Sequence, residues 1–240
     1  MVSRWGRKSS FQGLHTSPPP AHLPWIFPLP AVLCKVTYIV GGRTVGMATP
    51  RERMVRSAAL LIRERGAHPT AIADVLAHSG APRGSAYHHF PGGRTQLLCE
   101  AVDYAGDRVA EQIEQAPDSL ALLDGLFAGY RELLTRTDYR AGCPVVAVAV
   151  EAGDPDKPEQ SEPVIARAAT AFTRWTALIA DRMTADGIDA ERAAELAMLL
   201  LTSFEGGIVV ARAARDVGPL DVIHRQLRTL LQDALGKDRS

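Results

Sequence analysis

Cysteine and uninterrupted apolar segments are both scarce in this chain of 240 residues. The three cysteines, at positions 34, 99 and 143, are odd in number and match no metal-binding spacing. They therefore argue against a disulfide framework and are compatible with a reducing cytoplasm. The most apolar window, residues 23–40, contains three prolines and a lysine, and is too interrupted to cross a membrane. We expect a cytoplasmic protein with no membrane partner.

Motifs for common catalytic chemistry are absent as well. The chain has no nucleophile elbow, no phosphate-binding loop, no glycine-rich dinucleotide fingerprint and no HExxH zinc motif. His88 and His89 are adjacent, so on a helix their side chains point in different directions, and no cysteine or carboxylate stands at a supporting spacing. We predict that the protein is not an enzyme and holds neither a metal nor another cofactor.

The net charge of zero is an average over three unlike regions. Residues 1–49 contain five basic residues and no acidic one, and residues 50–94 contain seven arginines against three acidic residues. Residues 95–240 contain fifteen basic and twenty-four acidic residues. A basic module beside an acidic body favours contact between that module and a polyanion. Basic helices are also often merely solvated, so charge alone does not choose between nucleic acid and plain exposure.

Helical periodicity runs almost without interruption from residue 49 to residue 235, which predicts an all-α fold of about nine helices. Thr49 and Pro50 predict the start of the first helix, and Gly66 its end. The apolar run 145–150 has the composition of a strand, but no partner strand is visible, so we expect a buried helix. Residues 1–46 are expected to be a disordered extension, and we hypothesise that Met47 is the true start of translation.

Residues 70–89 predict two short helices joined by a tight turn. Thr70 is expected to cap the first helix, Gly80 to lie in the turn, and Pro82 to open the second helix. This spacing is typical of a helix-turn-helix, whose second helix enters the major groove of DNA. We therefore assign residues 47–94 to a three-helix DNA-binding domain and residues 95–236 to a larger helical domain.

Eight residues of this motif are candidate DNA contacts. Arg83, Ser85 and His88 are predicted to reach or approach base edges, and the small side of Gly84 permits a close approach to the groove. The other four are predicted to hold phosphates, either by their side chains or at a helix start: Thr70, Tyr87, His89 and Arg94.

The segment from Gly80 to Arg94, with Ile72–Ala73 before it and Leu97–Leu98 after it, resembles the DNA-binding domain of the TetR family of regulators. Gly142–Cys143–Pro144–Val145 and Phe204–Glu205–Gly206 resemble the LmrA/YxaF-type subgroup. The resemblance covers nearly all of residues 50–235. It departs from the family pattern at Ala86, where a larger apolar residue is commoner, and at Arg94, where lysine is usual.

The resemblance implies a homodimer that places two recognition helices in successive major grooves of a palindromic, double-stranded operator. It also implies that a small molecule binds in the larger domain and releases the DNA. We expect a ligand-responsive regulator that acts by repression, in keeping with the family's habit. The alternative is a helical ligand-binding or scaffold protein that does not bind DNA. The sequence identifies neither the effector nor the operator.

The candidate ligand-binding residues are mostly aromatic or apolar and lie at helical spacing, which is also typical of ordinary core. They are Phe127, Tyr130, Cys143, Phe172, Trp175, Met198, Thr202 and Glu205. Glu205 stands out because it follows an apolar run and precedes two glycines. A carboxylate drawn inside the fold needs a partner, so it would bond a ligand or the dimer seam. The other interpretation is a surface glutamate. Helix 189–214, with the last helix beside it, is the expected dimer surface.

Overall fold

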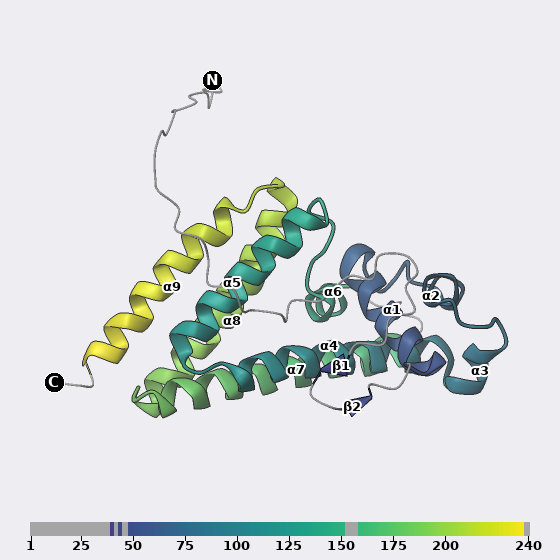
Figure 1. Ribbon diagram of the computed structural model, residues 1–240, viewed down its shortest axis with the longest axis horizontal. Coiled ribbons are helices and arrows are strands. Elements are labelled where there is room, and N and C mark those ends of the chain that lie inside the picture. Colours follow the sequence, from purple (N-terminus) through teal and green to yellow (C-terminus); the bar gives the residue numbers. More distant parts are fainter. Residues whose placement is uncertain (1–38, 41–42, 45–47, 152–157, 238–240) are drawn as a thin grey trace, which may run out of the picture. The chain divides into compact units, whose positions relative to one another are not determined.

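The computed structural model describes residues 39–40, 43–44, 48–151 and 158–237 (Figure 1). Strands β1 (Ile39–Val40) and β2 (Arg43–Thr44) form a two-residue antiparallel pair. The rest of the predicted extension 1–46 lies outside the described residues. The nine helices of the described chain are α1 (Pro50–Arg65), α2 (Ile72–Ser79), α3 (Ser85–His89), α4 (Gly93–Gln115), α5 (Ser119–Arg136), α6 (Pro144–Val150), α7 (Pro158–Ala185), α8 (Ala190–Ala214) and α9 (Gly218–Lys237).

The ends of α1 form as the sequence predicts. The Thr49 hydroxyl accepts a hydrogen bond from the Glu52 N–H at 3.2 Å, and the Glu52 carboxylate accepts one from the Thr49 N–H at 2.8 Å. This reciprocal cap satisfies donors that the first turn leaves free. Gly66 ends the helix with a φ of 91°, which a side chain would disfavour. The prediction of a helix rather than a strand after Pro144 is also confirmed, with Val145 and Val148 buried.

Two predicted helix starts are wrong by one or more residues. Helix α2 is capped at Ala71, whose N–H donates to the Asp74 carboxylate at 3.2 Å, and not at Thr70. Helix α3 begins at Ser85 and not at Pro82. Residues 82–85 instead form a turn in which the Ser85 N–H donates to the Pro82 carbonyl at 2.9 Å. Both errors arise because local turn hydrogen bonds compete with the first helical turn.

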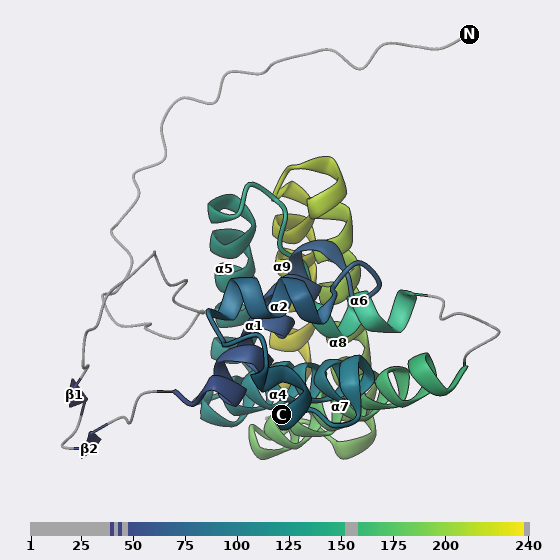
Figure 2. The same cartoon turned by 90° about the vertical axis from the view of Figure 1, so that its right-hand side faces the viewer.

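Helix α4 links the basic part of the chain to the acidic part. It packs against α1 on one side and along α7 on another, while α8 packs against both α7 and α9. The three N-terminal helices α1, α2 and α3 gather near the first residues of α4, and α5, α8 and α9 lie toward its other end (Figures 1 and 2). The predicted division at residue 94 thus falls at the start of a helix that both halves share.

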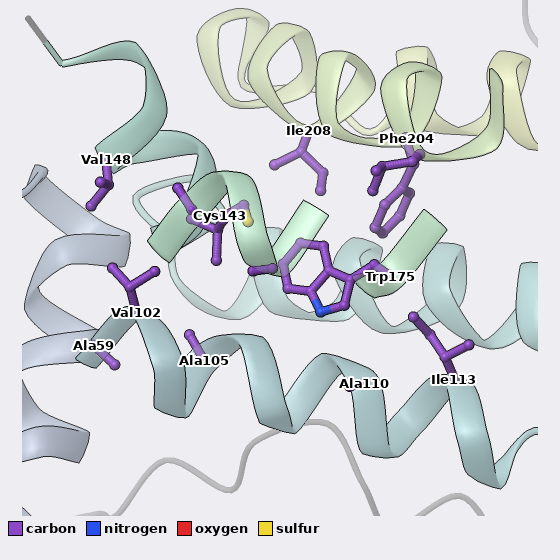
Figure 3. Packing of buried hydrophobic residues seen from close by; sticks show 14 of the residues in the cluster. Ala59, Val102, Ala105, Ala110, Ile113, Cys143, Val148, Trp175, Phe204 and Ile208 are labelled. Atoms are coloured by element: carbon purple, nitrogen blue, oxygen red, sulfur yellow. The ribbon is translucent and has the colours of Figure 1, made fainter. Parts of the chain in front are cut away.

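Trp175 of α7 lies in the core between α4 and α8, facing Ile113 on one side and Phe204 and Ile208 on the other (Figure 3). Its indole N–H donates to the Gly106 carbonyl at 2.9 Å, so the ring is buried without an unsatisfied donor. A Cβ at Gly106 would lie 3.2 Å from the Ala171 Cβ. Small residues at these two positions therefore allow α4 and α7 to approach closely.

The last turn of α1 is tied to the larger half by two hydrogen bonds. The Gly142 N–H donates to the Arg63 carbonyl at 2.9 Å, and Arg212 of α8 donates to the Glu64 carbonyl at 2.6 Å. These are carbonyls that a helix C-terminus leaves without intrahelical partners. The placement of α1 therefore depends on α8 and on the loop before α6.

Helix α8 is long and apolar enough to cross a membrane by length and hydropathy alone, with a mean hydropathy of 1.6 in its most apolar window. The sequence analysis, which looked to residues 23–40, missed this. Half of that window is buried inside the fold, and its inner residues, including Leu196 and Leu200, are part of the core. We therefore assign α8 to the packed bundle.

Candidate nucleic-acid interface and internal cavity

The turn between α2 and α3 projects a polar surface from an apolar base. Gly80 ends α2 in the left-handed region, with φ of 64°, where the chain can reverse without a Cβ clash. Three buried side chains make the apolar base: Val75 of α2, Ala86 of α3 and Phe90, which directly follows α3. They belong to the same core cluster as Met54 of α1. The two helices are thereby held at a fixed angle.

The opposite side of this motif is open to solvent. Arg83, Gly84 and His88 are exposed, and 73% of the surface of Tyr87 is accessible. Ser85 and His89 are half-buried. The Ser85 hydroxyl donates to the Pro82 carbonyl at 2.6 Å, so in this conformation it has lone pairs but no free proton to offer DNA. Arg83, Gly84, Tyr87 and His88 are thus exposed, whereas the Ser85 hydroxyl also lies 3.9 Å from the Sδ atom of the buried Met54 and so faces the core.

Thr70 does not belong to that face. Its side chain is 1% exposed, and its hydroxyl donates to the Gly66 carbonyl at 2.7 Å. Its backbone N–H donates to the Ala67 carbonyl at 3.0 Å. Both donors therefore stabilise the turn between α1 and α2. The prediction that Thr70 opens α2 and offers these groups to a phosphate does not fit the structure.

The guanidinium of Arg94 also points inward. It donates to the carbonyls of Thr70, at 3.0 Å, of His68, at 3.1 Å, and of Ala67. Burial lowers the pKa of Arg94, and the nearby Glu151 carboxylate opposes that shift. Because its donors are directed at backbone carbonyls, Arg94 holds the turn in front of α2. We correct the expectation that its side chain is directed at a phosphate.

This placement changes what a mutation at Arg94 should do. Replacing Arg94 with alanine is expected to lower the free energy of unfolding by about 2 kcal/mol or more, because charge-assisted hydrogen bonds to three carbonyls are lost. Urea denaturation measures this directly. If Arg94 contacted a phosphate instead, the substitution would leave stability unchanged and reduce only the salt dependence of DNA binding. An unchanged unfolding curve would therefore favour the prediction that Arg94 binds a phosphate.

Glu151 is a residue of this region that the sequence analysis did not identify. It directly follows α6, and its two carboxylate oxygens accept hydrogen bonds from the N–H groups of Ala67, at 2.7 Å, and His68, at 2.6 Å. The donors and the acceptor are more than eighty residues apart in the sequence. Nothing in the local pattern around a single glutamate indicates such a partner.

A small internal cavity lies between α4, α5, α7 and α8. It encloses about 20 Å³, which is room for about one water molecule. Three of the eight predicted ligand-binding residues line it, namely Tyr130, Trp175 and Glu205. The other lining residues are Val109, Gln112, Ile113, Leu126, Ile179, Leu200, Leu201 and Phe204. Glu205 is therefore the one charged side chain among the eleven.

The polar end of the cavity is a cluster of Tyr130, Cys143 and Glu205. The Cys143 thiol donates a hydrogen bond to the Glu205 carboxylate, while the Glu205 Oε2 atom is buried without a partner. Burial raises the pKa of Glu205 to about 7. Burial also raises the pKa of Tyr130 and of Cys143 well above their usual values, so both are neutral. A thiol held protonated in this way is a poor nucleophile.

The remaining predicted pocket residues do not line this cavity, although Phe127 contacts its lining residue Phe204, with 4.9 Å between ring centroids. Phe127 is fully buried and stacks on His224, with 5.0 Å between ring centroids. Phe172 contacts Trp175 edge to face at 5.6 Å. Met198 is 51% exposed and Thr202 is exposed as well, both on the outer face of α8. The exposure of Met198 and Thr202 does not fit their prediction as pocket residues, because helical periodicity alone does not show which face of α8 turns inward.

The outer faces of α8 and α9 carry most of the exposed apolar surface of the described chain. Six of its nine large exposed apolar residues lie there: Met198, Leu199, Val209, Val210, Val222 and Leu230. Along α8, Met198, Thr202, Gly206 and Val210 recur every four residues and so share one side. Exposed apolar residues gathered on two helices that pack together are compatible with an interaction site.

An exposed basic turn on a braced helix pair, carried by a helical bundle, defines a helix-turn-helix transcriptional regulator. The comparisons with known proteins agree. Residues 55–101 match the bacterial regulatory proteins of the tetR family, and residues 120–226 match the C-terminal domain of LmrA/YxaF-like transcriptional regulators. The chain belongs to the TetR family, in its LmrA/YxaF-like group.

Relatives and solved structures support this assignment. An uncharacterised HTH-type transcriptional regulator of Mycobacterium tuberculosis is 65% identical over 185 residues, which cover 77% of this chain and 95% of the relative. The regulator LmrA of Bacillus subtilis is 30% identical over 71% of this chain and 90% of its own length. A TetR regulator from Legionella pneumophila has the same fold, with a TM-score of 0.64 at 17% identity, covering 78% of this chain and 99% of that one.

Proposed function

We propose that the protein is a cytoplasmic homodimeric repressor that binds a palindromic DNA operator and leaves it when a small molecule enters the larger domain. The observation that carries the proposal is the exposure of Arg83, Tyr87 and His88 above a buried apolar base. Arg83 and His88 are the proposed base contacts, with Ser85 beside them as an acceptor. Tyr87 and His89 are the proposed phosphate contacts, and Gly84 permits close approach of the backbone.

The apolar outer face of α8 and α9 supports the homodimer. Two copies that met through this face would cover Val209 and Val210 from both sides. The contact would be isologous, as in most dimers with twofold symmetry. A twofold dimer presents two copies of α3, which explains why the proposed operator is a palindrome.

The cavity supports the proposal of a small-molecule effector and limits its chemistry. Its walls are mostly apolar and aromatic, with the amide of Gln112 among them, and its one ionisable carboxyl group is that of Glu205. An effector with an apolar body and a hydrogen-bond donor would satisfy the buried Oε2 atom, whereas an anion would be repelled. Because the cavity holds about one water, a larger effector must separate the surrounding helices. Binding of this kind favours one of two conformations, as regulation requires.

Capture of fragmented genomic DNA by the purified protein tests the proposal. We expect the protein to select a small set of sequences that contain inverted repeats. It should bind these sequences about a thousandfold more tightly than random DNA, or tighter still. Binding should weaken steeply as salt is raised. Weak binding without sequence preference would favour the second candidate, a helical ligand-binding or scaffold protein that does not act on DNA.

Replacing Arg83 with alanine is expected to weaken operator binding by about 1–3 kcal/mol and to relax selection at one base position of each half-site. Fluorescence anisotropy on the captured operator and on variants of each base pair measures both effects. Arg136→Ala on α5 is the matched control, since this arginine is also exposed but lies far from α3 in the sequence. Unchanged affinity in Arg83→Ala would show that the assignment of base contacts is wrong.

A further inference from the structure

Helix α3 is too short to fix its own direction. It has five residues, and the Phe90 N–H that follows it donates to the Ala86 carbonyl at 2.8 Å. A helix of little more than one turn gains little stability from its own hydrogen bonds. Its direction therefore depends on α1, against which it packs, and on the turns that join it to α2 and to α4 (Figure 1).

Phe90, the residue at which α3 ends, is held from two sides. Its ring is buried, with 1% of the residue exposed. The guanidinium carbon of Arg51, in the first turn of α1, lies over this ring at 5.6 Å from its centroid, and a guanidinium at such a distance is attracted by the face of an aromatic ring. The Phe90 carbonyl accepts from the Gly93 N–H at 2.8 Å, so Phe90 also shapes the turn into α4.

Arg51 is also bonded to α4. Its Nη2 atom lies 2.7 Å from Oε2 of Glu100. The other oxygen of Glu100 accepts from the Gln96 amide nitrogen at 3.0 Å, and the Gln96 amide oxygen accepts from the Gly92 N–H at 2.9 Å. With the Gln96 amide reversed, a donor would face the Gly92 N–H and an acceptor would face Glu100, so the chain of hydrogen bonds has one arrangement.

The joint between α3 and α4 leaves little room for another arrangement. A Cβ at Gly92 would lie 3.1 Å from both the Cβ and the Oε1 atoms of Gln96, so a side chain there would push Gln96 aside. On the other side of the joint, the rings of His89 and Phe90 meet edge to face, with 6.4 Å between their centroids. A shift of Phe90 therefore also shifts His89, a proposed phosphate contact.

We propose that Arg51 is a positioning residue for operator binding, which holds the end of α3 through the Phe90 ring and the start of α4 through Glu100. The inference rests on the proposed function, because it concerns the side chains that α3 offers to DNA. With both contacts in place, α3 keeps one direction relative to α1 and α4. Without them it samples several directions, and operator affinity falls with the fraction of molecules in the one that fits.

A direct phosphate contact is the competing role for Arg51, because 48% of its side chain is exposed. The two roles predict opposite effects of Glu100→Ala. If Arg51 bound a phosphate, the carboxylate of Glu100 would compete for its charge, and removing that carboxylate would raise the affinity for DNA. If Arg51 positions α3, the same substitution lowers operator affinity, although it removes a negative charge from the DNA-binding domain.

Fluorescence anisotropy on the captured operator and on random DNA separates these roles. In Arg51→Gln, the ratio of operator affinity to random-DNA affinity is expected to fall by about fivefold, the combined scale of one exposed cation–π contact and one exposed ion pair. Glu100→Ala should lower the ratio by about threefold, and the double variant should lose no more than Arg51→Gln alone. Arg56→Gln, which removes the same charge from an exposed site on α1, is the matched control and should leave the ratio unchanged. Tighter DNA binding by Glu100→Ala, or equal ratios in Arg51→Gln and Arg56→Gln, would overturn the proposal.

Amide hydrogen exchange tests the positioning without DNA. The N–H groups of Phe90 and Gly93 donate within the joint between α3 and α4, so their exchange should rise by about threefold or more in Arg51→Gln and in Glu100→Ala. Exchange in the core of α4 and α7 should stay the same, since a general loss of stability would raise it everywhere. Unchanged exchange at both amides in Arg51→Gln would contradict the positioning role. If the unmodified protein selects no operator, the proposed function fails, while the exchange results still decide whether Arg51 holds α3.

Discussion

Replacing Glu205 with glutamine is expected to flatten the dependence of stability on pH. The folded carboxyl group has a pKa of about 7, raised by burial from 4.5. The folded state therefore binds more protons than the unfolded state between these values, and the free energy of unfolding falls as pH rises through that window. The full contribution is about 3 kcal/mol, present at low pH and lost above pH 7.

Urea denaturation at a series of pH values between about 5 and 8 measures this slope. The glutamine variant should keep most of the Cys143 hydrogen bond, carry no ionisable group, and be more stable than the unmodified protein at the high end of the series. Glu162→Gln is the control, because its side chain is exposed and should leave the slope as it was. If stability still falls with pH in Glu205→Gln, another titrating group causes the pH dependence, and the prediction for Glu205 is wrong.

Replacing Val210 with glutamate is expected to give a monomer. Val210 is 54% exposed in the single chain and belongs to the proposed dimer face on α8 and α9. A charge buried at a twofold contact meets its own copy without a partner, which is costly. Loss of the dimer also removes the advantage of binding two half-sites together, so operator affinity should fall by about a hundredfold or more.

Sedimentation equilibrium measures the mass, and anisotropy on the captured operator measures the affinity. Ile165→Glu on α7 is the control, since Ile165 is 37% exposed and lies outside α8 and α9. It should remain a dimer with full affinity. A Val210→Glu variant that stays dimeric would contradict the assignment of this face, whereas a monomer that still binds the operator fully would contradict the need for two half-sites.

Much of the fold follows from local signals in the sequence. The capping residues Thr49 and Pro50 and the glycine at 66 predicted both ends of α1, and the predicted helix 189–214 agrees with α8 to within one residue. These signals are reliable because each helix end must satisfy its own free donors and acceptors with residues nearby. The starts of α2 and α3 were mispredicted where two local hydrogen-bonding patterns compete.

The residues of the candidate sites were predicted with less success than the helices. The exposed face at 83–89 was found because its spacing and composition are local properties. Thr70 and Arg94 were assigned to phosphates because their position at a helix start is local too, but their donors are used by carbonyls of the same turn. Met198 and Thr202 were placed in the pocket, although they lie on the outer face of α8.

The sequence by itself determined the all-helical architecture, the helix-turn-helix with its exposed basic turn, and the exclusion of common catalytic motifs. Only the tertiary structure decided that Arg94 and Glu151 clamp one turn, that Glu205 is buried at a cavity, and that the apolar stripe of α8 faces outward. Helix ends and turns depend on neighbours a few residues away. The direction of the Arg94 side chain depends on carbonyls at least 24 residues away, and that of Glu151 on N–H groups more than eighty residues away, and no local pattern records these partners.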